Sequence, residues 1–155
     1  MTDRLDLEAA GFFPADHAVV AEGKVYVNGG FWDVIRFPAY PQVLPVAVVA
    51  VLRVPYRAYH QDHKFEVTME DADARDVLLR VEGQFRVGSS AEMRVGDPSI
   101  LPMAMLGQVA IPRPGDFSFI LRVDGGELAR YPFRALQVAA PMEMPGPPAD
   151  LPGGH

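Results

Sequence analysis

Short segments with apolar side chains at every second position are the feature that most constrains the fold of this chain. In residues 63–69, Phe65, Val67 and Met69 alternate with polar or charged residues, and residues 117–123 repeat the pattern. Successive side chains of a strand point to opposite faces, so each segment predicts a strand with one face in a core. Hardly any stretch shows helical periodicity. The chain is therefore predicted to be all-β.

Turn residues and apolar runs predict the remaining strands. Asp124-Gly125-Gly126 is typical of a hairpin turn, and Glu22-Gly23 is a second turn. Residues 45–54 form a nearly continuous run of Val, Ala and Leu, which is typical of a strand covered on both faces or in the middle of a sandwich. Residues 100–111 are apolar but interrupted by a proline and a glycine, which predicts an edge strand or two short strands.

Together these segments predict an antiparallel β-sandwich, immunoglobulin-like or similar, of about seven to nine strands. The positions on the inward faces predict which side chains are buried. They are Val25, Val27, Trp32, Val48, Val67, Val81, Phe85, Phe119 and Phe133.

Residues 23–35 hold the only tryptophan, Trp32. Val25 and Val27 fall on one face of an extended chain. The following Asn28-Gly29-Gly30 fits either a tight hairpin turn or a glycine bulge that bends one long strand. The glycines leave room for a large ring, and Trp32 fits either a packed core or a ligand platform.

Length and composition predict one domain and a tail. A chain of 155 residues with 49% hydrophobic and 22% charged residues is typical of a single globular domain. After Ala139, prolines and glycines interleave. We therefore expect a β-sandwich domain over residues 1–138 and a Pro/Gly-rich tail over residues 139–155 without a core of its own.

Charge and targeting signals exclude several partners. A net charge of −6 and scattered arginines oppose binding to nucleic acid. The first residues lack a secretory signal, and the most apolar run, residues 43–52, is too short to cross a bilayer. The absence of cysteine excludes disulfides and suits a reducing compartment. We expect a cytoplasmic protein that does not bind membranes.

One block of the sequence resembles a known family. Ala15-Asp16-His17-Ala18 is followed by Gly23-Lys24-Val25-Tyr26-Val27-Asn28-Gly29-Gly30-Phe31-Trp32-Asp33. This resembles an uncharacterised bacterial family in which Ala-Asp-x-Ala precedes Gly-Lys-Leu-Tyr-Val-x-Gly-Gly-Gly-Trp-Asp, and Phe31 stands where that family has its third glycine. The likeness continues to about Val138. It implies a compact β-domain and no catalytic residue, because the family has no known function.

Few residues suggest chemistry. His60 and His63 are the only closely spaced histidines, and with His17 from a distant strand they suggest a three-imidazole metal site, although a solvated loop is the commoner outcome. The chain has no phosphate-binding loop, no nucleophile elbow and no cysteine nucleophile. We assign no catalytic residue, cofactor or metal, and the motifs favour a non-enzymatic role.

Two hypotheses for function follow. The first is a non-catalytic structural or protein-interaction domain in a larger assembly, with a protein partner or self-association. Its predicted partner-binding residues are Met142, Met144 and Leu151, apolar anchors in the tail. The second is a small-molecule- or metal-binding enzyme with a site near Trp32, His17, His60 and His63. The sequence identifies no ligand.

Overall fold

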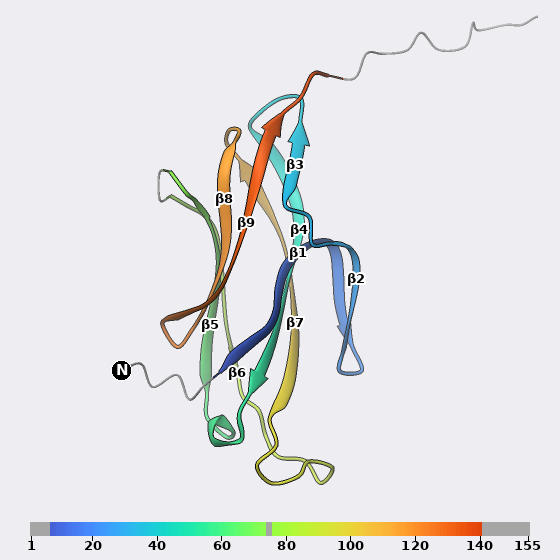
Figure 1. Cartoon of the computed structure of the whole chain (residues 1–155), viewed down its shortest axis with the longest axis vertical. Helices are drawn as coiled ribbons and strands as arrows, with labels where there is room; N and C mark the ends of the chain where they lie inside the picture. Colours follow the sequence, from blue (N-terminus) through green and yellow to red (C-terminus); the bar gives the residue numbers. More distant parts are fainter. Residues whose placement is uncertain (1–6, 74–75, 141–155) are drawn as a thin grey trace, which may run out of the picture.

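The computed structural model describes residues 7–73 and 76–140. Over these residues the chain is all-β, as predicted, with nine strands in two sheets and one turn of 3₁₀ helix, η1 (Tyr56–Ala58) (Figure 1). No helix in this part of the chain has the length and apolar character needed to cross a membrane. The strands are β1 (Glu8–Ala21), β2 (Lys24–Gly30), β3 (Val34–Phe37), β4 (Gln42–Val54), β5 (His63–Asp71), β6 (Val77–Phe85), β7 (Ser99–Ile111), β8 (Gly115–Val123) and β9 (Gly126–Gln137).

The strands are divided between two sheets. Sheet A has the order β2-β1-β4-β7, and sheet B has the order β3-β9-β8-β5-β6. Neighbouring strands are antiparallel except β3 and β9, which are parallel. The antiparallel prediction is therefore wrong for this pair. Parallel strands need a long connection, and here most of the chain lies between β3 and β9.

The main core lies between the two sheets. Val48, Val67, Phe119 and Phe133 are buried there, as predicted. The other predicted core residues are only half-buried: Val25, Val27, Trp32, Val81 and Phe85. Val81 and Phe85 belong to β6, which ends sheet B and so has no neighbouring strand on one side. Trp32 lies in the connection between β2 and β3.

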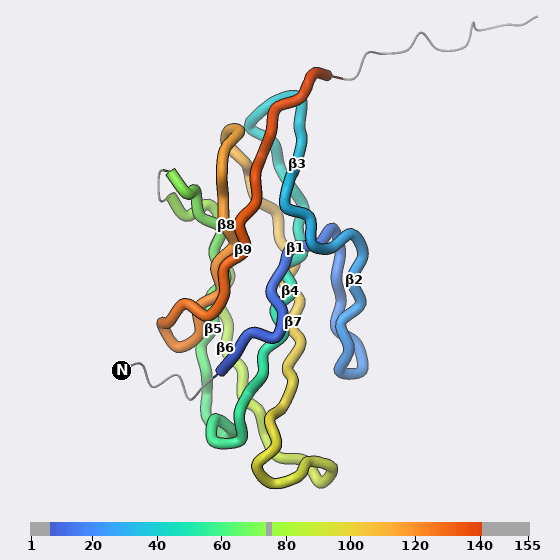
Figure 2. Tube along the Cα trace, in the orientation of Figure 1, coloured from blue at the N-terminus to red at the C-terminus, as the bar shows by residue number. Residues whose placement is uncertain are grey.

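A second cluster covers the outer face of sheet A. In β4, Val46, Val48 and Ala50 belong to the main core, whereas Ala47 and Val49 point the opposite way and pack with Ala18 of β1. Val25 and Val27 of β2 pack against the same cluster. Figure 2 shows the end of the β1–β2 hairpin alongside β7, on the side away from β8 and β9. The folded hairpin explains why the apolar run in β4 is covered on both faces, as predicted.

The segment Asn28-Gly29-Gly30 serves neither of the two predicted roles. The hairpin turn is at Glu22-Gly23, whose φ values are 53° and 72°. After Gly29, at φ 63°, strand β2 ends and the chain crosses to β3 in sheet B. Phe31 also has a left-handed φ of 64°, and its ring stacks on Phe13 with centroids 3.9 Å apart. The segment is thus a crossover between the sheets.

Candidate interaction surface

The three histidines suggested for a metal site do not come together. His17 pairs with Asn28 in sheet A, whereas His63 pairs with Phe85 in sheet B. His60 is exposed after η1, with its Nε2 3.0 Å from the Ser89 hydroxyl. Among the residues that the structure describes, no group of three or more His, Cys, Asp or Glu side chains is placed to hold a metal ion.

His63 has both ring nitrogens engaged. Its Nδ1 is 2.8 Å from Oδ2 of Asp124, and its Nε2 is 2.9 Å from the carbonyl oxygen of Ala58. Both partners are acceptors, so the arrangement favours the imidazolium, which donates from both nitrogens. Burial lowers the pKa of His63, but the hydrogen bonds to Ala58 and Asp124 outweigh it and leave the pKa above its usual 6.5.

Asp124 is the matching half of this pair. Burial raises its pKa, but hydrogen bonds from His63 and from the backbone N–H of Lys64 outweigh this and lower the pKa below its usual 3.8. The residue lies in the β8–β9 turn, 61 residues from His63 in the sequence. The pair therefore joins the start of β5 to that turn and has a structural role.

Replacing Asp124 with asparagine is expected to destabilise the fold in a pH-dependent way. The raised pKa of His63 stabilises the fold fully below about pH 6.5, and this contribution is lost as the pH rises through the folded-state pKa. The lowered pKa of Asp124 also stabilises the fold. This contribution to stability is lost only as the pH falls through the folded-state pKa of Asp124, which lies below 3.8. We expect a loss of about 1 kcal/mol at pH 5.5 that shrinks toward pH 9, measured by urea unfolding.

The control variant is Asp62→Asn, which removes a nearby charge that does not hydrogen-bond His63. It is expected to change the pH profile little, because Asp62 is 68% exposed. Asparagine at residue 124 keeps an oxygen for the Lys64 N–H and tolerates the φ of 49°. A loss that does not change with pH would contradict the assigned role of the pair.

Trp32 is half-buried and packs against the main core. Its ring meets Phe119 and Phe133 edge-on, with centroid distances of 6.3 and 5.5 Å. Its Nε1 is buried without a hydrogen-bond partner among the described residues. These contacts support the core interpretation over the ligand platform, and neither Trp32 nor His63 presents a free polar group to a shared cleft.

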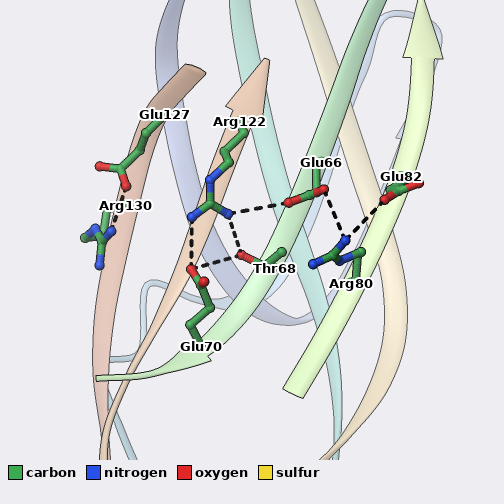
Figure 3. A network of polar contacts seen from close by, with 8 residues as sticks. All are labelled: Glu66, Thr68, Glu70, Arg80, Glu82, Arg122, Glu127 and Arg130. Atoms are coloured by element: carbon green, nitrogen blue, oxygen red, sulfur yellow. Dashed lines mark hydrogen bonds and ion pairs between the residues drawn. The ribbon is translucent and has the colours of Figure 1, made fainter. Parts of the chain in front are cut away.

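The outer face of sheet B carries a ladder of charges (Figure 3). The guanidinium of Arg122 lies 3.5 Å from Glu66 and 3.2 Å from Glu70, and it hydrogen-bonds the buried Thr68. Arg80 lies near Glu66 and Glu82, and Arg130 pairs with Glu127. Each arginine drawn therefore faces a carboxylate. The ladder satisfies itself, leaves none of these guanidinium groups for an anionic ligand, and is typical of a solvated face.

Strand β7 is the edge of sheet A. Its 13 residues form one continuous strand that pairs with β4 along its whole length. The prediction of an edge strand is confirmed, as one strand rather than two. None of the described backbone hydrogen bonds outside the strand ladders involves residues 99–111, so the second edge of β7 presents its N–H and C=O groups unpaired.

β7 also lacks the charges that usually protect an edge. The other strands that end a sheet carry them: β2 has Lys24, β3 has Arg36, and β6 has Arg80 and Glu82. β7 is longer than all three and has no charged residue. Proteins discourage edge-to-edge pairing with charge, proline or short strands. Of these three protective features, β7 has only a proline, Pro102.

Apolar side chains flank this edge. Ile100 and Leu106 point away from sheet B and are 52% and 62% exposed. On the core side, Leu101, Met103 and Met105 remain half-exposed because no strand lies beyond them. A shallow cleft beside Leu106 is also lined by Asp16, His17, Pro45 and Gln108. The strand and these side chains form the candidate interaction surface, here called the β7 edge.

Sequence reasoning found the edge strand but not its importance. The available signal was the absence of any charged residue from residue 98 to residue 112, in a chain with 34 charged side chains. The predicted partner-binding residues Met142, Met144 and Leu151 lie outside the described residues.

Comparison with curated proteins gives no match. Residues 11–136, from within β1 to near the end of β9, match the family described as "Family of unknown function (DUF6941)". The match covers most of the chain and agrees with the resemblance to an uncharacterised family. This chain therefore belongs to family DUF6941, whose function is unknown.

Proposed function

We propose that this chain is a non-catalytic protein-interaction domain and a component of a larger assembly. The observation that supports this is the β7 edge, a long strand with unpaired backbone groups and no charge. An extended partner strand can add to such an edge, because main-chain hydrogen bonds supply affinity and flanking side chains supply specificity. Adding a strand there requires no charged side chain of β7 to lose its water.

The surroundings of the other candidate residues support a binding role over an enzyme. His63 holds two structural hydrogen bonds, His17 and His60 lie on different elements, and the charge ladder on sheet B is compensated. We further propose that the two packed sheets form an immunoglobulin-like sandwich. That likeness concerns the fold only and adds no function by itself.

The tail is proposed as a second partner-binding segment. It follows the end of β9, where the N–H of Val138 donates to the carbonyl of Phe37. Met142, Met144 and Leu151 are the proposed apolar anchors. Deleting the residues after Ala139 is expected to lower the assembled mass in light scattering and to leave the stability nearly unchanged. An unchanged mass, with no copurifying partner, would rule out this role.

Photo-crosslinking in living cells tests the interaction role of the β7 edge. A photoreactive residue at Ile100 of the full chain is expected to give a covalent adduct with a protein. The matched position is Arg80, which is equally exposed on the outer face of sheet B and is expected to give none. If neither position gives an adduct, the proposed function is wrong. Fractionating the same cells tests the predicted cytoplasmic location.

A further inference from the structure

We infer that the partner of the β7 edge is a second copy of this chain, with the two β7 strands antiparallel about a two-fold axis. This inference rests on the proposed function and names the partner. A strand paired with its own copy makes an isologous contact, in which each residue pair occurs twice. The two four-stranded sheets would join into one sheet of eight strands.

Charge favours a second copy at this edge. The chain carries a net charge of −6, so two copies repel each other over most approaches. Any register between two β7 strands places only uncharged residues opposite one another, because the strand contains no Asp, Glu, Lys or Arg. Two copies can therefore pair along β7 without burying a charged side chain of this strand and without placing like charges of the two strands opposite each other.

Side-chain sizes favour one register. Overlap of all 13 residues is centred on Met105, the middle of β7. On the outer face, Leu106 then lies opposite Ala104 of the second copy, and Ile100 lies opposite Ala110. On the core-side face, Met103 lies opposite Gly107. Leu106, Ile100 and Met103 thus meet small residues, Met105 meets its own copy at the two-fold axis, and the half-exposed apolar side chains of the edge become covered.

A charge-swap experiment at Leu106 tests this arrangement. In the proposed register the two Leu106 side chains are diagonal neighbours, within about 7–8 Å. The full chain should be dimeric by light scattering and sedimentation at micromolar concentrations. Leu106→Lys and Leu106→Glu are each expected to weaken the dimer about tenfold or more. An equimolar mixture of the two variants should restore it. Leu106 is 62% exposed, so circular dichroism should confirm that both variants fold.

The control is Val77→Lys, which adds the same charge to a 43% exposed apolar residue at the start of β6 in sheet B. It should leave the dimer intact. A monomeric wild-type chain, variants that still dimerise fully, a mixture that stays monomeric, or an equal effect of Val77→Lys would each overturn the inference. If the chain is monomeric but a photoreactive residue at Ile100 cross-links to another protein, the partner is not a second copy and the proposed function stands. No adduct at all would overturn both.

Discussion

Replacing Phe119 with alanine is expected to lower the free energy of unfolding by about 3–5 kcal/mol. The side chain is completely buried between the two sheets. Its ring stacks on Phe133 with centroids 5.1 Å apart and meets Trp32 edge-on. In sheet B it stands between Met69 of β5 and Tyr131 of β9. The substitution therefore removes buried apolar surface and leaves a cavity that residues from three elements cannot easily fill.

Urea unfolding followed by circular dichroism measures this loss. Phe119→Leu supplies a graded variant, expected to cost less because it keeps most of the volume, and it remains informative if the alanine variant does not fold. Tyr26→Ala is the matched surface control, since this aromatic side chain is 50% exposed on β2. Its cost should stay near 0.5 kcal/mol, an approximate limit for surface sites. Equal losses for Phe119→Ala and Tyr26→Ala would contradict the two-sheet core.

Local patterns predicted individual strands well. The alternation in β5 and β8 identified Val67 and Phe119 as buried, because the period of two is a property of the strand itself. The Asp124-Gly125 turn was equally local, since both residues adopt the positive φ that such a turn requires. The apolar run of β4 correctly predicted cover on both faces. These features depend on a few consecutive residues.

The neighbours of each strand were not predictable in the same way. Alternation says which face of a strand is apolar but not which strand lies beside it. Residues 28–30 therefore did not reveal that the chain passes from sheet A to sheet B there, nor that β3 lies parallel to β9. The folded hairpin was missed for the same reason, because the cover over Ala47 and Val49 comes from Ala18, Val25 and Val27, distant in sequence.

The candidate site was likewise predictable from local sequence only in part. Pro102 and Gly107 correctly marked β7 as an edge, since a proline lacks the N–H that a central strand needs. The hypothesis of a three-histidine metal site did not anticipate that Asp124, 61 residues away in the sequence, hydrogen-bonds Nδ1 of His63. The importance of β7 emerges only when its length and charge are compared with those of the other strands that end the sheets.

Replacing Gly29 with alanine is expected to destabilise the fold by about 2–4 kcal/mol in total. One part is backbone strain, because Gly29 has a φ of 63° and a side chain there costs about 1–2 kcal/mol. The other part is crowding, because the added methyl carbon would lie 2.8 Å from Cγ and 3.2 Å from Cβ of Asp16. Asp16 is exposed, so its carboxylate can turn aside, whereas its Cβ is held by the pairing of β1 with β2 and can shift only slightly.

Gly23→Ala separates the two contributions, since Gly23 has a similar φ of 72° but nothing within 4 Å of an added methyl carbon. It should show the strain alone. The double variant Gly29→Ala with Asp16→Ala should recover much of the crowding cost, which gives a coupling free energy above about 0.5 kcal/mol in a double-mutant cycle. Because Asp16 of β1 lies opposite Gly29 of β2, the coupling tests the pairing of these two strands where the hairpin meets the crossover. If Gly29→Ala costs no more than Gly23→Ala, Asp16 does not lie against this glycine and the two strands do not pair in the described register.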